Sequence, residues 1–153
     1  MPQSKLSLKD AQQLIKLARS AIAGKEISLD GFNEKQGVFV TLNSYPSKQL
    51  RGCIGFPMPA YRLKKAVAEA AKAAAYEDPR FPPLGKQEKF LVEISVLTVP
   101  ELIRTNPLKS FKIGQHGLII NYDGKSGLLL PQVFPEWKAN NEKALEMTCE
   151  KAG

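Results

Sequence analysis

The chain has 153 residues, 43% of them hydrophobic, which suffices for the core of one ordinary domain, and no stretch approaches the roughly 18 apolar residues that cross a membrane. Its beginning, "MPQSKLSLKDAQ", lacks the apolar run of a secretory signal, so we expect a cytoplasmic protein that does not bind a membrane. The formal net charge of +7 suits an acidic ligand, but the 22 basic residues are scattered along the chain and do not indicate a nucleic-acid surface.

The first predicted element is an amphipathic helix in "SLKDAQQLIKLARSAIAG", residues 7–24. Ser7 and Asp10 can form a capping box at its start, and Gly24 suits its end. Apolar residues recur at the spacing of one helical stripe, which is typical of a helix that packs on a core. They are Leu8, Ala11, Leu14, Ile15, Ala18 and Ile22.

Two strands are predicted next. "GVFVTLN" (37–43) is rich in β-branched and aromatic residues, and "QLRGCIG" (49–55) can pair with it across a turn at 44–47. Cys53 would then lie at a strand end or just beyond it. Gly52 and Gly55 around it provide either positive φ for a tight turn or close approach of the backbone.

A slim, alanine-rich helix follows over residues 61–76, with Pro59 in its first turn, and the prolines of "YEDPRFPPLG" end it. The small side chains predict close packing on a sheet. The dense apolar run "FLVEISVLTVP" (90–100) predicts a central strand that is covered on at least one face. Within it, Glu93 needs a partner if it is buried, or it faces solvent on an edge.

The last third contains a hairpin signal and a helix. In "GLIINYDGKSGLLLPQV", two apolar runs flank Asp123-Gly124-Lys125-Ser126, in which Asp-Gly is a favoured turn pair. Asn141 is predicted to cap a final helix that Gly153 ends. One side of that helix carries Leu145, Thr148, Cys149 and Ala152. Helices interspersed with hairpin-linked strands predict an α+β fold with a largely antiparallel sheet and flanking helices.

Six blocks of the chain, in this order, resemble one family, the AMMECR-type domain, named after a human chromosomal-deletion region. The blocks are "LRGCIG" (50–55), "EDPRFPPL" (77–84), "VEISVLT" (92–98), "GQHGLII" (114–120), "LLLPQV" (128–133) and "TCEKAG" (148–153). The resemblance covers nearly the whole chain and implies a single AMMECR-type domain over residues 1–153, built in two lobes, with the larger lobe on an antiparallel sheet.

The resemblance also implies partners. Bacterial and archaeal members are similar to the A component of a three-part system, whose other parts resemble a Memo-type protein and a radical S-adenosylmethionine enzyme. The resemblance names no substrate. Relatives usually continue after the last block with a leucine and a tryptophan-containing segment, so we expect any site element of that segment to be absent from this chain.

Cys53 is the best single candidate for chemistry. A free thiol has a pKa of about 8.5, and a neighbouring cation such as Arg51, or the amides of a turn at Gly52 and Gly55, would favour the nucleophilic thiolate. The competing interpretation is that Cys53 packs as a small apolar side chain while the glycines shape the backbone. Cys149, on a helix stripe, is expected to face the core.

Three further residues belong to the candidate site. His116 is the only histidine, so a catalytic cysteine–histidine pair must use it or not exist. Arg80 can bind a carboxylate or phosphate in bidentate fashion, and Asp78 can cap or form a salt bridge. Alternatively, Asp78 and Arg80 form a network that holds their own loop in place.

The sequence names no cofactor and no metal site. Two cysteines and one histidine are too few for a structural zinc site, and neither a phosphate-binding loop nor a dinucleotide fingerprint is present. Two functions remain open. The chain is a small enzyme or enzyme component whose "LRGCIG" pocket acts on an anionic small molecule or a protein-bound intermediate, or it is a non-catalytic module that presents the "LRGCIG" surface to a partner protein.

Overall fold

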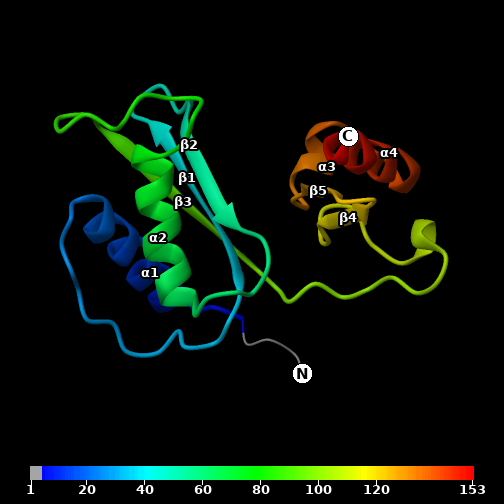
Figure 1. The fold of residues 1–153 in the computed structure, drawn as a ribbon, viewed down its shortest axis with the longest axis horizontal. Coiled ribbons are helices and arrows are strands. Elements are labelled where there is room, and N and C mark those ends of the chain that lie inside the picture. Colours follow the sequence, from blue (N-terminus) through cyan, green and yellow to red (C-terminus); the bar gives the residue numbers. More distant parts are fainter. Residues whose placement is uncertain (1–4) are drawn as a thin grey trace. The chain divides into compact units, whose positions relative to one another are not determined.

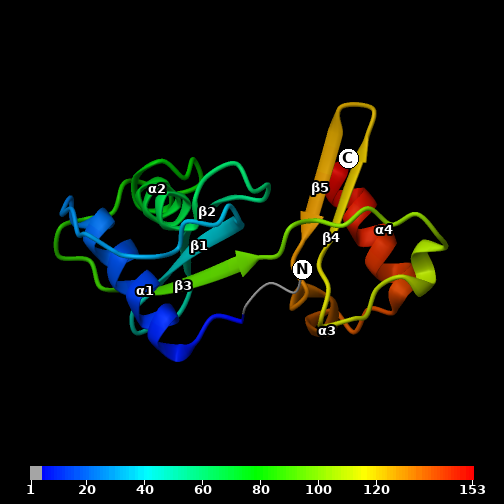
Figure 2. The same ribbon diagram turned by 90° about the horizontal axis from the view of Figure 1, so that it is seen from below.

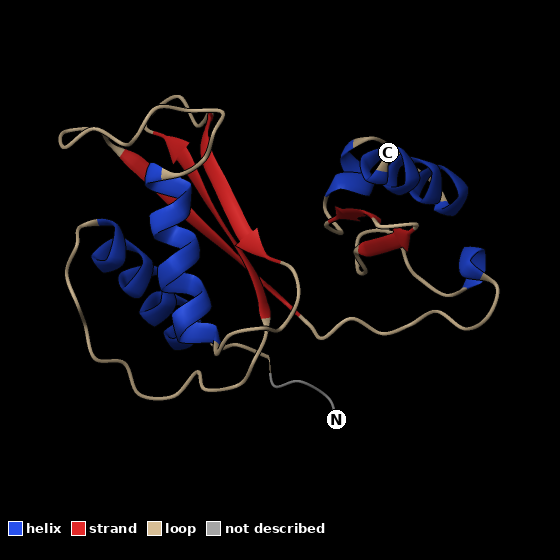
Figure 3. Cartoon of the chain, viewed as in Figure 1, coloured by secondary structure: helices blue, strands red, loops and turns tan. Residues whose placement is uncertain are grey.

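The computed structural model describes residues 5–153, which divide into two compact units, an N-terminal unit up to Val99 and a C-terminal unit, Pro100–Gly153 (Figure 1). The predicted domain, 1–153, and the N-terminal segment expected to lack a secretory signal both include residues 1–4. These four residues lie outside the described residues. Helices and antiparallel sheets are mixed in the chain, so the predicted α+β class is confirmed (Figure 3). No helix within residues 5–153 has the length and apolar character that spanning a membrane requires.

The N-terminal unit is a three-stranded sheet with two helices on one face. The sheet has the order β2-β1-β3, and both neighbouring pairs are antiparallel (Figure 1). Its elements are α1 (Leu8–Ile22), β1 (Gly37–Ser44), β2 (Leu50–Phe56), α2 (Leu63–Tyr76) and β3 (Phe90–Leu97).

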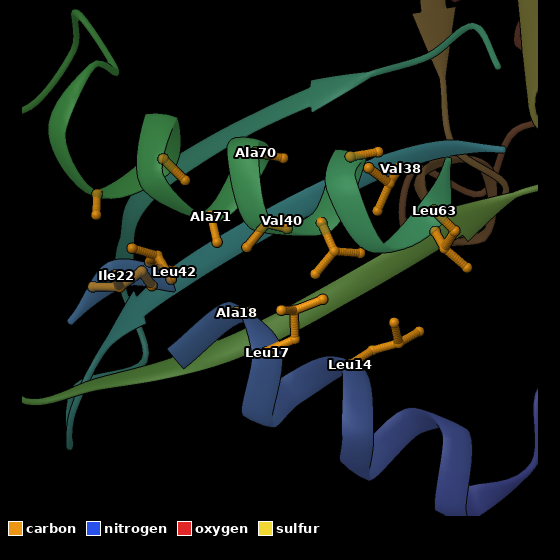
Figure 4. Packing of buried hydrophobic residues seen from close by; sticks show 14 residues of the cluster. Leu14, Leu17, Ala18, Ile22, Val38, Val40, Leu42, Leu63, Ala70 and Ala71 are labelled. Atoms are coloured by element: carbon orange, nitrogen blue, oxygen red, sulfur yellow. The ribbon is translucent and has the colours of Figure 1, made fainter. Parts of the chain in front are cut away.

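The core of this unit lies between the helices and alternate residues of the strands (Figure 4). Val38, Val40 and Leu42 of the central strand β1 are fully buried. Successive strand residues point to opposite faces, so every second residue of each strand points away from the helices. The alanines of α2 let this helix lie directly on the sheet, as predicted; Ala66, Ala70, Ala71, Ala74 and Ala75 are buried.

Helix α1 begins as predicted, but only part of its predicted apolar stripe is buried. The Ser7 side chain accepts from the Asp10 amide and the Asp10 carboxylate accepts from the Ser7 amide, which completes the capping box. Leu14, Leu17, Ala18, Ala21 and Ile22 are buried, whereas Leu8 and Ala11 are exposed and Ile15 is half-buried. The prediction that these last three belong to one stripe with the core residues was wrong.

The predicted hairpin of β1 and β2 is confirmed, but the predicted place of Cys53 in it was wrong. Cys53 lies inside β2, opposite Thr41 of β1, and not at a strand end. Neither Gly52 nor Gly55 has a positive φ, so "LRGCIG" is a continuous strand rather than a turn. The glycines fit the strand because each lies where other backbone approaches closely.

Two neighbouring predictions also change. β3 pairs only with β1, so it is an edge strand and not the central one, and Glu93 on it is exposed. Helix α2 begins at Leu63, later than Pro59, because the chain before it is held extended: Arg62 pairs with Lys35 in an isolated β-bridge.

The C-terminal unit is a β-hairpin packed with a helix. Its elements are the 3₁₀ helix η1 (Pro107–Lys109), β4 (Leu118–Tyr122), β5 (Lys125–Leu129), α3 (Val133–Glu136) and α4 (Asn141–Ala152). The predicted hairpin is confirmed (Figure 2): Asp123 and Gly124 have positive φ and join β4 to β5. The turn is shorter than predicted, because Lys125 and Ser126 already pair with β4. Phe134 is fully buried in the core of this unit.

Helix α4 differs from its prediction in two respects. Its N-cap is Asn140, whose side chain accepts from the Lys143 amide, whereas the Asn141 side chain donates to the backbone carbonyls of Leu108 and Phe111. Thr148 is fully buried but Cys149 is exposed. The buried face follows Ala144 and Thr148, one turn apart, and Cys149 lies beyond its edge.

Candidate functional site

The backbone of Cys53 is held by the loop that follows α2. Because β2 is an edge strand, part of its backbone has no neighbouring strand to bond with. The Cys53 amide donates to Oδ2 of Asp78 at 2.9 Å, and Nη2 of Arg80 donates to the Cys53 carbonyl oxygen at 3.3 Å. Asp78 therefore supplies the acceptor, and Arg80 the donor, that a further strand would supply. We call these two residues the edge clamp.

The two members of the edge clamp also hold each other. Arg80 donates through Nε to Oδ1 of Asp78 at 3.0 Å and through Nη2 to Oδ2 at 2.8 Å, in the bidentate geometry that carboxylates favour. Asp78 is only 4% exposed. The hydrogen bonds from Arg80 hold the pKa of the Asp78 carboxyl well below its usual range, although burial alone would raise it. Asp78 is therefore an ionised, fully engaged carboxylate.

Arg51 is engaged in the same way with a different carboxylate. The register of β1 and β2 shifts beside it, so this residue forms a bulge, a feature that redirects side chains. Its guanidinium group donates through Nε and Nη2 to the two carboxylate oxygens of Glu88. These bonds lower the pKa of Glu88. The ring of Phe81 lies 5.9 Å from the guanidinium carbon of Arg51 and 5.5 Å from that of Arg80, so the two ion pairs meet over one aromatic ring.

Gly52 and Gly55 are required for close backbone approach. A β-carbon added to Gly52 would lie 2.1 Å from the carbonyl oxygen of Ala74 in α2. One added to Gly55 would lie 2.3 Å from the carbonyl oxygen of Val38 and 2.4 Å from the Phe39 ring. Both contacts are far inside van der Waals distance. The glycines of "LRGCIG" thus shape the backbone against α2 and β1, and no cradle of turn amides surrounds the thiol.

The thiol of Cys53 lies on the face of the sheet away from the helices. Cys53 is half-buried, and the Thr41 hydroxyl donates to its sulfur at 3.3 Å. Thr41 is the cross-strand partner of both Cys53 and Glu93, so the three residues form one row across the sheet. Within the N-terminal unit, no described helix covers this side. We call it the uncovered face; it carries Phe39, Thr41, Asn43, Cys53, Leu91, Glu93 and Ser95.

His116 belongs to the C-terminal unit, in a turn before β4. It is exposed, and its Nδ1 accepts from the Lys112 amide at 3.0 Å, so in the neutral ring Nε2 carries the proton. Cys53 belongs to the N-terminal unit. The pairing of His116 with Cys53 therefore stays a prediction.

The structure brings together four of the predicted site residues, Arg51, Cys53, Asp78 and Arg80, and adds two. Glu88 neutralises Arg51, and Thr41 contacts the thiol. The alternation of "GVFVTLN" predicts that Thr41 lies on the other face from Val40, but it does not predict the pairing of Thr41 with Cys53. Nothing in "GKQEKF" distinguishes Glu88 from an exposed glutamate. Within residues 5–153, no three potential ligands among His, Cys, Asp and Glu gather where they could hold a metal ion.

Known proteins match this chain over nearly its whole length. The family model AMMECR1 matches residues 9–153. Protein MJ0810 of Methanocaldococcus jannaschii is 46% identical over 162 residues, which cover 97% of this chain and 81% of that protein. Protein TV1384 of Thermoplasma volcanium is 43% identical, with 99% and 82% covered.

A solved structure is also similar. The crystal structure of the uncharacterized Protein PH0010 from Pyrococcus horikoshii has a TM-score of 0.80 and 47% sequence identity, and the match covers 92% of this chain and 78% of that one. None of these three relatives carries a name that states an activity.

Proposed function

This chain belongs to the AMMECR1 family, and from that premise we propose that it is a cytoplasmic, non-catalytic module that recognises a partner protein with the uncovered face of its sheet. The relatives are uncharacterised, so the proposal depends on the site itself.

The observation that carries the proposal is the neutralisation of both arginines beside Cys53. Arg51 is bound by Glu88 and Arg80 by Asp78, each through two hydrogen bonds. An arginine that already binds a carboxylate presents little free charge to an anionic substrate. The same bonds fix the loop after α2 to the edge of β2. The "LRGCIG" block is therefore better suited to building a rigid surface than to binding a small anion.

The uncovered face has the composition of a recognition surface. Phe39 and Leu91 are apolar, Thr41, Asn43 and Ser95 are polar, and all five are half-buried. Interfaces between non-obligate partners combine apolar area with scattered hydrogen-bonding groups in this way. Because strand residues have rigid backbones, such a face needs little ordering when it binds.

We propose a Memo-type protein or a radical S-adenosylmethionine enzyme as the partner, since family members of this kind resemble one component of a three-part system. In that assembly this chain would contribute contacts, and a partner would contribute chemistry. The two partner classes are tested separately.

A second candidate function is thiol chemistry at Cys53 on the same face. It is favoured by one observation: the sulfur is half-buried rather than sealed in the core, and the Thr41 hydroxyl donates to it. This function requires a base or a partner-bound electrophile, and His116 is the only imidazole that could serve.

Affinity capture with variants separates the two functions. The immobilised chain is incubated with a purified Memo-type protein and, separately, with a purified radical S-adenosylmethionine enzyme. Cys53→Ser keeps the size of the side chain and removes the soft nucleophile, so it should retain the partner. Glu93→Arg changes an exposed residue of the uncovered face and should lose it, while Glu69→Arg on the exposed side of α2 is the matched control. Failure of the wild-type chain to retain either protein would refute the proposed partners.

A further inference from the structure

Helix α1 carries a shallow groove on the side that faces away from its core. The groove has a volume of about 610 Å³ and is open to solvent. Its apolar surface comes from residues outside the buried stripe, among them Leu8, which is 77% exposed, and Ile15. The basic residues Lys16, Arg19 and Lys25 line it, and no acidic residue does. The groove therefore combines exposed apolar side chains with basic ones.

Helix α4 of the C-terminal unit carries a surface of the opposite charge. A shallow hollow of about 460 Å³ lies along it, with Leu108 and Leu145 as its apolar part. Its charged residues are Glu142, Glu146 and Glu150, and no basic residue lines it. These glutamates recur at four-residue spacing, so they form one row along the helix.

The charges of both surfaces are largely free to bind a partner. Among the described residues, Lys16 and Lys25 take part in no ion pair. Glu146 pairs with Lys143 at 3.2 Å, but both side chains are more than half exposed, so this pair contributes little. Arg19 is different, because it donates to the Phe90 carbonyl and its guanidinium group lies over the Phe90 ring. Arg19 therefore shapes the groove, and Lys16 and Lys25 supply its available charge.

We propose that the α1 groove binds the acidic surface of α4 in a second copy of this chain. The argument is complementarity in two properties at once: each surface has an apolar strip, and each is lined by charges of a single, opposite sign. A second copy supplies the α4 surface, so the contact brings the positively charged groove of one copy onto the row of glutamates of the other. This interface uses neither the uncovered face nor the edge clamp, so it is independent of the proposed function.

Reversing the charges of each surface, first separately and then in a mixture, tests the proposal. Lys16→Glu/Lys25→Glu makes the α1 groove acidic, and Glu146→Lys/Glu150→Lys makes the α4 surface basic. Each variant alone then opposes like charges between groove and α4 surface and should dimerise at least tenfold more weakly than the wild type in analytical ultracentrifugation. In an equimolar mixture of the two, the groove of one variant meets an α4 surface of unlike charge on the other. The mixture should therefore form a heterodimer that neither variant forms alone.

A control variant, the dependence on salt and a check of folding complete the test. Lys9→Glu/Lys72→Glu changes the net charge equally but lies outside the groove, so it should dimerise like the wild type. Salt at about 0.5 M should weaken the wild-type dimer. Circular dichroism of each variant establishes that it is folded. A wild-type chain that is monomeric up to about 100 µM overturns the proposal, and so does a mixture that stays monomeric. Binding of that monomer to anionic lipid vesicles through Lys16 and Lys25 would assign the groove to a membrane instead.

Discussion

The backbone amide of Cys53 donates to the carboxylate of Asp78, 25 residues further along the chain, at 2.9 Å. The residue that the sequence marks as a candidate nucleophile is thus held by a buried acidic side chain through its backbone. Arg80 completes the contact at the carbonyl of the same residue. The "LRGCIG" and "DPRF" blocks therefore meet as parts of one structural unit, in which the loop takes the place of a fourth strand.

Replacing Asp78 by Asn should destabilise the protein by about 2–3 kcal/mol. The change leaves the Cys53 amide with a weaker acceptor and deprives Arg80 of its charge partner, and a buried polar group that loses its partner costs about 1–3 kcal/mol. Half of the Arg80 side chain is exposed, which keeps the loss from being larger. Urea unfolding followed by circular dichroism measures the change. Glu69→Gln, which breaks the exposed pair with Lys72, is the control and should cost less than about 0.5 kcal/mol.

Acid should remove the contribution of Asp78 selectively. Its pKa in the folded protein is lowered below the ordinary value of 3.8, chiefly by the hydrogen bonds from Arg80. A lowered folded pKa means that the carboxylate stabilises the fold fully above pH 3.8, and that this stabilisation is lost as the pH falls from there toward the folded pKa. Unfolding free energies of wild type and Asp78→Asn should differ equally at about pH 7 and pH 5, and the difference should begin to shrink at about pH 3. A difference that stayed constant over this range would show that the charge of Asp78 is not what stabilises the clamp.

Gly52→Ala should be strongly destabilising, by more than about 3 kcal/mol, because the added β-carbon would lie 2.1 Å from the backbone oxygen of Ala74. Backbone on both sides leaves no flexible side chain to move. Gly85→Ala is the matched control, since its nearest neighbour would be the Glu88 side chain at 3.6 Å, an ordinary contact. Thermal unfolding of the two variants compares them. Equal melting temperatures would mean that α2 can shift away from β2 at little cost.

Alkylation of the native protein should modify Cys149 before Cys53. Cys149 is exposed on α4, whereas Cys53 is half-buried with its sulfur bonded to Thr41. Thiol reactivity depends on both access and the fraction of thiolate. Peptide mass spectrometry after timed labelling gives both rates, and denaturant should bring them together. If Cys53 reacts faster than Cys149 in the native state, it is an activated thiolate and the second candidate function becomes the better one.

Local sequence patterns predicted most of the elements because local physics decides them. The capping box of Ser7 and Asp10 and the turn at Asp123-Gly124 lie where the sequence places them, since each depends on residues within one turn. The order of the strands is not determined by local residues. The apolar run of β3 resembles a central strand, yet β3 is at the edge of the sheet. One side of β3 still packs against the core of the N-terminal unit, which accounts for its apolar residues.

The candidate site could be predicted as a set of residues but not as an arrangement. Glycines on both sides of Cys53 suggest a turn as readily as a strand, and only the position of Ala74 in α2 shows that Gly52 is needed for close approach. The partner of Arg51 lies 37 residues away, in a segment with no distinguishing pattern. Contacts between segments that are distant in the sequence determine both the role of Gly52 and the partner of Arg51.

The central claim is that the uncovered face binds a partner protein without the chemistry of Cys53. Isothermal titration calorimetry of a purified Memo-type protein against the wild-type chain, Cys53→Ser and Glu93→Arg tests it most directly. The account predicts that Cys53→Ser binds within about twofold of the wild type and that Glu93→Arg binds at least about tenfold more weakly, a loss of roughly 1.4 kcal/mol or more. Binding that survives Glu93→Arg unchanged and is lost in Cys53→Ser would contradict it.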